Sequence, residues 1–403
     1  MTDSVGDFAD KARRWLEGNV PAKPWPTDPR DYIAFARAFQ ARLHDAGFAG
    51  INWPAEYGGQ GLGDAEQRAF VDVSARFSMP VETFSIAMGM CGPTIIALGT
   101  EAQKRRFIRP LLRADEIWCQ LFSEPDAGSD LAALRTSAVR DGDRWKINGQ
   151  KVWTSHAQYS DFGLLLTRTD PSVPKHRGLT MFLIPMNTAG VIVRPLRDMA
   201  GGERFNEVFF DDVMLDDEAR IGAVNAGWQV AVQTLTFERM SVTNRIRPQS
   251  HALSFTSLLE RARRSGVTAE AHVRDELVGL HMRERLAELL GDRHAEEARA
   301  GAPPGPRGSV GKLVSAELHR FSARAATNVL AAAATRWERD DDGSERLGAA
   351  ICEAPMMGIA GGTNEIQRNI VGERVLGLPR EQAVDTAVPF RELRASRARD
   401  VQR

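Results

Sequence analysis

The sequence is poor in cysteine, and several classes of protein are excluded by what it lacks. Its three cysteines (Cys91, Cys119 and Cys352) are odd in number and far apart, which argues against a disulfide framework. No hydrophobic run approaches the length of a membrane span, and the N-terminal residues lack the apolar core of a signal peptide. A formal net charge of −1 gives no electrostatic reason to expect a nucleic-acid partner. We therefore expect a cytoplasmic, reduced protein.

Common nucleotide- and metal-binding motifs are also missing. The sequence contains neither G-x-G-x-x-G nor G-x-x-x-x-G-K, so binding through a Rossmann fold or a P-loop is not supported. The eight histidines are scattered, without metal-ligand spacing and without a serine or cysteine nucleophile beside them in a known motif. We expect no metal site.

The pattern of hydrophobic residues changes twice along the 403 residues, which are too many for one compact core. The first part is helical, with an apolar stripe at helical spacing through Tyr32, Phe35, Phe39 and Leu43. We predict an α+β multidomain protein with three domains. They are an N-terminal α-helical domain (1–117), a middle β-barrel or sandwich domain (118–222), and a C-terminal four-helix bundle (223–403).

The middle domain is predicted from turn dipeptides and short β-rich runs. Asp141-Gly142 and Asn148-Gly149 are both typical of hairpin turns, because these residues tolerate positive φ. Four further short strands are expected, at Phe162–Thr167, Leu179–Ile184, Val191–Val193 and Glu207–Phe210.

The C-terminal domain is predicted from long helical stripes through Val230–Arg247, Val273–Leu290 and Lys312–Trp337. A Pro/Gly loop at 300–309 and an acidic turn at 339–343 interrupt them. After these, Gly361-Gly362-Thr363 form a tight turn that opens an amphipathic helix with Ile366, Ile370, Val371 and Val375 on one side. The N-terminus of such a helix can receive a phosphate or carbonyl oxygen, although this kind of turn is usually structural.

Two polar segments of the middle domain have two possible explanations. The segment from Gln120 to Asp130 ends a strand with a hydroxyl-bearing turn, and Lys151–Ser155 places Trp153 beside two hydroxyls. Such residues can line a flat heteroaromatic ring, with hydroxyls donating to its edge and an indole against its face. The alternative is a turn capped by serines and a tryptophan in the core.

Several long motifs, in order, resemble the flavin-dependent acyl-CoA dehydrogenases over nearly the whole chain. They are WPAEYGG (53–59), LFSEPDAGSD (121–130), INGQKVWTS (147–155), FNEVFFDDV (205–213) and AGGTNEIQRNIVGERVLGLP (360–379). The resemblance implies FAD held between the β domain and the C-terminal bundle. It also implies α,β-dehydrogenation of an acyl-CoA thioester, with electrons passed to an electron-transfer flavoprotein.

The resemblance also assigns site residues, motif by motif. FAD contacts are expected from Phe122, Ser123, Trp153, Ser155, Thr363 and Glu365. Arg274 resembles an arginine that reaches the FAD of a neighbouring subunit, although Leu277 and Val278 replace the phenylalanine and glycine that normally follow it. Ser129 is expected to touch the acyl-CoA.

The base that removes the α-proton is expected on a helix. Many family members carry a glutamate where this chain has Gly361, whose backbone N–H is still expected to bind the thioester oxygen. Glu238, in TLTFER (234–239), matches the position of the base in long-chain and isovaleryl-type members, which also lack the C-terminal glutamate. We therefore predict Glu238 as the base, with Arg239 beside it at the substrate.

Three functional readings remain. The first is an acyl-CoA dehydrogenase that forms a homo-oligomer, a dimer or tetramer. The second is a flavin oxidase or monooxygenase on the same fold, and the third is one subunit of a heteromeric dehydrogenase. The acyl chain is not fixed by the sequence, although a helix-borne base suits long, branched or bulky groups in known subgroups.

Overall fold

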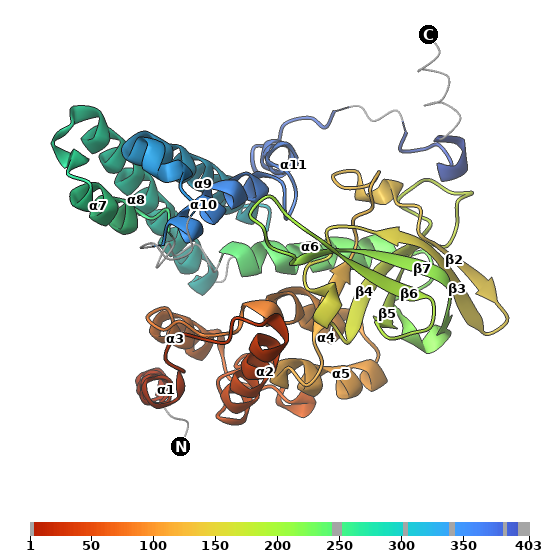
Figure 1. Ribbon diagram of the computed structural model, residues 1–403. Helices are drawn as coiled ribbons and strands as arrows, with labels where there is room; N and C mark the ends of the chain where they lie inside the picture. The colour runs from red at the N-terminus through yellow and green to blue at the C-terminus, as the bar shows by residue number, and fades with distance from the viewer. Residues whose placement is uncertain (1–3, 244–251, 301–304, 338–342, 382–384, 394–403) are drawn as a thin grey trace, which may run out of the picture. The chain divides into compact units, whose positions relative to one another are not determined.

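The computed structural model describes residues 4–243, 252–300, 305–337, 343–381 and 385–393. They form two compact units. The first contains residues 4–196, 204–237 and 385–393, and the second contains residues 197–203 and the described part of 238–381. The predicted order of an α-helical part, a β part and a second α-helical part is confirmed (Figure 1).

Three of the N-terminal helices, α1, α2 and α5, begin at residues whose side chains cap them. The five helices are α1 (Val5–Asn19), α2 (Pro29–Asp45), α3 (Asp64–Ser74), α4 (Gly92–Leu98) and α5 (Glu101–Arg113). Ser4, Asp28 and Thr100 each accept a hydrogen bond from a backbone N–H of the first turn, which satisfies a donor that the helix leaves unpaired. On α2, Phe39 and Leu43 of the predicted stripe are buried.

The middle domain is one eight-stranded sheet. Its strands are β1 (Trp118–Leu121), β2 (Ser137–Asp141), β3 (Arg144–Lys151), β4 (Phe162–Arg168), β5 (Leu179–Pro185), β6 (Val191–Leu196), β7 (Phe205–Asp216) and β8 (Arg220–Ile221). The order is β6-β7-β3-β2-β4-β5-β8, and β1 pairs in parallel with β4. The four further predicted strands are confirmed as β4 to β7. All six residues from Gly163 to Arg168 on β4 are buried, which agrees with a central position in the sheet.

Of the two predicted hairpin turns, one is confirmed and the other is wrong. Asp141 pairs with Arg144 across the turn at Gly142, whose φ is +61°. At Asn148-Gly149, by contrast, β3 continues and its register with β7 shifts at a bulge. The side chain of Asn148 fixes this bulge through two hydrogen bonds to Asp212, of 2.8 and 2.9 Å. A glycine at a close backbone approach therefore marks a bulge here instead of a turn.

The C-terminal part contains α6 (Gly227–Thr243), α7 (Phe255–Arg264), α8 (Ala271–Arg299), α9 (Gly308–Leu330), α10 (Ser344–Glu353) and α11 (Asn364–Ile370). Apolar side chains of α7, α8, α9 and α10 form one core. The predicted extension of α6 to Arg247 and most of the acidic turn at 339–343 lie outside the described residues, as does part of the 300–309 loop. The prediction that α9 continues to Trp337 is wrong. The chain leaves helical geometry at Ala331, which has a φ of +46° and starts a 3₁₀ turn.

Candidate active site

Glu238 on α6 and Gly361 in the C-terminal turn lie next to each other. A Cβ atom added to Gly361 would lie 3.2 Å from Oε1 of Glu238. Gly361 has a φ of +67°, a conformation that side-chain-bearing residues rarely adopt. The sequence offered these two positions as alternative places for one carboxylate, and the structure brings them together. The role of Glu238 as the base stays a prediction.

The half-buried carboxyl group of Glu238 has an unusual pKa. Burial raises this pKa to about 7, although the positive charges of Arg239 and Lys312 act in the opposite direction. A general base works best when its pKa lies near the operating pH. This carboxylate is therefore suited to taking a proton at neutral pH.

Lys312 is a residue that sequence reasoning missed. It lies on α9, is only 4% exposed, and its Nζ donates to the carbonyl oxygen of Met357 at 2.8 Å. Burial lowers the pKa of Lys312, and Glu238 partly offsets this. A single lysine in a helical stretch is normally a surface residue, so nothing in the sequence marked Lys312 as buried.

The Gly361–Thr363 turn is held by the helix that follows it. Thr363 caps α11, accepting from the N–H of Ile366 at 3.3 Å. Gln367, which is 1% exposed, donates from Nε2 to the carbonyl oxygen of Gly361 at 2.8 Å. A Cβ atom on Gly362 would lie 2.7 Å from the same Nε2. Both glycines therefore allow the turn to pack closely.

The amphipathic helix predicted after the turn is only partly confirmed. Alpha-helical geometry ends at Ile370 and a π-helical turn follows (Val371–Val375). Gln367 is the buried residue of α11, whereas Val375, Leu376 and Leu378 are 38%, 67% and 56% exposed. The α-helix is therefore shorter than predicted, and the polar Gln367 occupies its buried position.

Of the other predicted residues of the C-terminal part, Glu365 and Arg274 make local contacts and Arg239 lies beside Glu238. Glu365 is exposed and pairs with Arg368 at 3.5 Å. Arg274 donates to the carbonyl oxygens of Thr268 and Ala269 of its own chain. Arg239 is half-buried, and burial lowers its pKa. The cofactor and substrate contacts predicted for these residues stay predictions.

The β domain brings its two predicted flavin segments side by side. The N–H of Val152 donates to the carbonyl oxygen of Ser123 at 2.9 Å, so the residues after β1 run beside the residues after β3. Phe122 is buried, and Ser123 and Ser155 are half-buried. Trp153 is 62% exposed and has a φ of +60°. The alternative that Trp153 is a core residue is therefore wrong.

A buried ion pair that sequence reasoning missed fastens these two segments together. Nζ of Lys151 donates to Oε1 of Glu124 at 2.8 Å and to the carbonyl oxygen of Phe122 at 3.0 Å. Lys151 is 0% exposed and Glu124 is 8% exposed. The carboxylate of Glu124 also accepts from the N–H groups of Arg135 and Thr136. Both residues lie within polar motifs of the sequence, so neither charge was marked there as buried.

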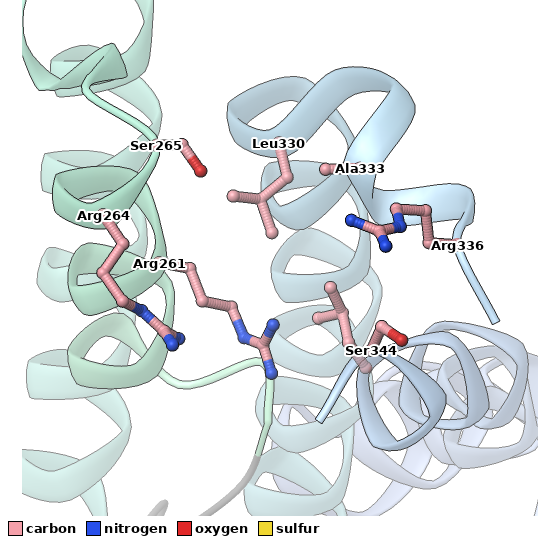
Figure 2. Close-up of a pocket in the computed structure, with 8 residues that line it drawn as sticks. Arg261, Arg264, Ser265, Leu330, Ala333, Arg336 and Ser344 are labelled. Atoms are coloured by element: carbon pink, nitrogen blue, oxygen red, sulfur yellow. The ribbon is translucent and has the colours of Figure 1, made fainter. Parts of the chain in front are cut away.

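A separate cavity of about 110 Å³ lies within the C-terminal helices (Figure 2). It is lined by three arginines together with small and apolar residues: Arg261, Arg264, Ser265, Leu330, Ala333, Arg336, Ser344 and Leu347. Pockets for cofactors and drug-sized ligands have volumes of roughly 300–1,000 Å³. This cavity is therefore too small for a flavin or a CoA ester, and it contains none of the residues predicted from the sequence.

The described part of the chain has neither a membrane span nor a cluster of metal ligands. None of the described helices has both the length and the apolar character needed to cross a membrane. Among the same residues, no group of three or more His, Cys, Asp or Glu side chains is arranged to hold a metal ion.

Comparison with known proteins identifies the family. Residues 2–115, 119–213 and 225–376 match the N-terminal, middle and C-terminal domains of acyl-CoA dehydrogenase. The chain is 39% identical over 389 residues to the acyl-CoA dehydrogenase IpdE1 of Mycobacterium tuberculosis (strain ATCC 25618 / H37Rv), covering 94% of this chain and 98% of that protein.

Two solved structures are similar over their whole length. One is the Tcur3481–Tcur3483 steroid ACAD, with a TM-score of 0.79 and 27% identity over 94% of this chain and 98% of that one. The other is the ChsE4–ChsE5 complex from Mycobacterium tuberculosis, with a TM-score of 0.75 and 31% identity over 95% and 99%. This chain therefore belongs to the acyl-CoA dehydrogenase family, whose members are FAD-dependent oxidoreductases that act on CH–CH groups.

Proposed function

We propose that this chain dehydrogenates an acyl-CoA thioester to its trans-2-enoyl-CoA, with electrons passed on to an electron-transfer flavoprotein. The observation that carries the proposal is the carboxylate of Glu238, whose pKa is about 7 and whose Oε1 lies 3.2 Å from the Cβ position of Gly361. The resemblance places the family's base at one of these two positions. In this chain only position 238 carries a carboxylate.

Glu238 takes the α-proton in this proposal. The α C–H of a thioester is a poor acid, so the carbonyl must be polarised while the base removes the proton. The N–H of Gly361 supplies a donor for the thioester oxygen, and the bond from Gln367 to the carbonyl oxygen of Gly361 holds the other peptide group of the same residue. Arg239 and Lys312 keep the pKa of Glu238 from rising further. They hold part of the carboxylate population ready at neutral pH.

The residues of the β domain fit a flavin. A flat ring system needs an aromatic plane that is free to contact it and donors at its edge. Trp153 is exposed beside Phe205 at a centroid distance of 6.0 Å, and the hydroxyls of Ser123 and Ser155 belong to the two adjoining segments. We propose that these residues and Phe122 hold FAD, which accepts the β-hydrogen as hydride when bound.

The proposed acyl group is bulky and of the steroid type. One similar solved structure is that of a steroid ACAD. In this chain Gly361 carries no side chain, which leaves more room near the base than a glutamate would. Ser129 is exposed in the loop after β1 and is proposed to contact the CoA ester.

We propose that a second acyl-CoA dehydrogenase-type chain covers α8. Val278, Met282, Leu286 and Leu289 recur at helical spacing on this helix and are 47–62% exposed. Exposed apolar residues gathered on one face mark a protein interface. One similar structure is a complex of two proteins, ChsE4 and ChsE5. The partner is therefore a second copy or a related chain, and the molar mass in solution with and without Met282→Lys tests this.

Anaerobic reduction of the bound flavin by a panel of acyl-CoA esters tests the proposed reaction. We expect steroid-type esters to bleach the flavin fastest, with slow reoxidation by air and rapid reoxidation by an electron-transfer flavoprotein. Glu238→Gln should still bind the ester but reduce flavin about 10²–10⁴-fold more slowly, the usual contribution of a general base. Rapid reoxidation by air would support the oxidase instead, and normal reduction by Glu238→Gln would overturn the base assignment.

A further inference from the structure

Residues 385–393 lie against the β4–β5 connection of the same compact unit (Figure 1). The N–H of Phe390 donates to the carbonyl oxygen of Val173, and the N–H of Arg391 donates to that of Pro171, each at 2.9 Å. Pro174 and Pro389, next to these bonds, form an isolated antiparallel β-bridge. The C-terminal segment is therefore fastened to this connection by its backbone.

A buried lysine joins the same segment to the loop that contains Ser129. Nζ of Lys175 lies 2.7 Å from Oδ2 of Asp385 and 2.9 Å from Oδ2 of Asp130. Lys175 is 6% exposed, so its charge is removed from water and depends on these two carboxylates. Burial lowers the pKa of Lys175, but Asp385 and Asp130 together outweigh burial and keep the pKa above its ordinary value. One ammonium group thus links the C-terminal segment to the residue that follows Ser129.

An arginine beneath Phe390 makes a second link to the same loop. The guanidinium carbon of Arg168 lies 3.6 Å from the centroid of the Phe390 ring. Arg168 is 4% exposed and donates to the carbonyl oxygens of Ala132, Leu134 and Lys175. Arg168 therefore binds both the chain just after Ser129 and the β4–β5 connection. The ring of Phe390 covers its guanidinium group.

We propose that residues 385–393 are a strap that holds the Ser129–Asp130 loop in the position that receives acyl-CoA. The proposal rests on the proposed function in one respect, the role of Ser129 at the substrate. Ser129 itself is exposed, and its neighbours are fixed by Lys175 and Arg168, both of which contact the strap. A loop that is ordered before binding lowers the entropy lost when the ligand binds. Asp385 and Phe390 are therefore positioning residues, which act through Lys175 and Arg168.

Two variants of the holoenzyme test the strap. Asp385→Asn removes one carboxylate from Lys175, and Phe390→Leu keeps apolar bulk but removes the ring over Arg168. We expect faster amide hydrogen exchange across residues 126–135, together with an increase of about tenfold in the KM for the acyl-CoA ester, the change expected from one charge-assisted hydrogen bond. The limiting rate of flavin reduction and the flavin content should stay unchanged. Asp385→Glu should restore both readouts.

Arg391→Ala is the matched control. Arg391 lies in the same strap, and its side chain pairs with Glu392 at 4.0 Å. Unchanged exchange at residues 126–135 in both variants would overturn the proposal, and so would faster exchange with an unchanged KM. If the natural enzyme binds no acyl-CoA ester while exchange still responds to Asp385→Asn, the strap is supported and the proposed function fails instead.

Discussion

Nζ of Lys151 lies 2.8 Å from Oε1 of Glu124, and both side chains are almost completely buried. Burial raises the pKa of Glu124, but Lys151 and the hydrogen bonds from Thr136 and Arg135 together outweigh burial and keep it below its ordinary value. Burial lowers the pKa of Lys151 below its ordinary value, and the negative charge of Glu124 partly offsets this. Each charge therefore depends on the other, and the pair fastens Ser123 beside Val152.

Lys151→Met should lower the free energy of unfolding by about 3–5 kcal/mol, because it leaves a buried carboxylate without its cation. In this variant the pKa of Glu124 should rise above its unfolded value, so the folded state binds a proton more tightly than the unfolded state. The loss of stability should therefore grow as the pH rises from about 5 to about 8. Urea unfolding at several pH values measures this. Lys146→Met, which removes a partly exposed lysine from the same strand, should have little effect.

Trp153→Ala should release flavin with little loss of stability. Trp153 is 62% exposed, so its truncation should change the unfolding free energy of the apoprotein by less than about 1 kcal/mol. Trp145→Ala on the same sheet is the contrast. Trp145 is 4% exposed and donates to Asp217 at 2.7 Å, so its loss should cost about 3–5 kcal/mol. Equal losses of apoprotein stability in the two variants would contradict the exposed position of Trp153.

Glu238→Gln should stabilise the apoprotein at pH 8 while it slows proton removal. The folded pKa of about 7 lies above the unfolded value of roughly 4.3, so the folded state binds the proton more tightly. The contribution of Glu238 to stability is therefore present at low pH and is lost as the pH rises to 7. Glutamine does not titrate, so the melting temperatures should differ at pH 8 and converge near pH 4. A variant less stable than the natural chain at pH 8 would contradict the buried carboxylate.

Lys312→Met should move the pH profile of flavin reduction to higher pH. The positive charge of Lys312 lowers the pKa of Glu238, so its removal should raise the pH at which kcat/KM reaches half its maximum. Lys312→Arg keeps the charge and should move the midpoint less. If both variants lose activity equally at every pH, Lys312 acts through its hydrogen bond to the carbonyl oxygen of Met357 and not through its charge.

Gly361→Glu made together with Glu238→Thr should regain part of the activity that Glu238→Thr alone loses. The space that Oε1 of Glu238 leaves is next to the new Cβ, so a carboxylate from position 361 can enter it. The regain should be partial, because a side chain at a φ of +67° costs about 1 kcal/mol. Gly361→Ala with Glu238 retained is the comparison, and it should impair reduction by crowding the base. An inactive double variant that folds and binds FAD would show that the two positions do not serve one substrate.

The sequence was most informative where side-chain pattern and local structure agree. The β strands and the Asp141-Gly142 turn could be predicted because short runs of β-prone residues and a residue with positive φ act locally. Asn148-Gly149 has the same local chemistry but lies opposite Asp212 of a distant strand, and that long-range pairing decides in favour of a bulge. Helix α9 ends at Ala331, where no proline or glycine gives warning.

The candidate site shows the same limit. The segments that contain Glu238, Gly361 and Trp153 were recognisable from motifs. The residues that support them were not: Lys312 reaches the backbone of Met357, and Lys175 reaches Asp385, 210 residues later. These contacts depend on tertiary packing, and a lone lysine in a sequence is normally a surface residue. The spacing of residues in the sequence could therefore not predict the partners of these two lysines.

The 3.2 Å between Glu238 and the Cβ position of Gly361 also makes a glutamate at one position incompatible with a glutamate at the other. Two carboxyl groups in such a space would have to share one proton, because they cannot both ionise. Any side chain at position 361 would also crowd Glu238. A chain that keeps Glu238 is therefore expected to keep glycine at position 361.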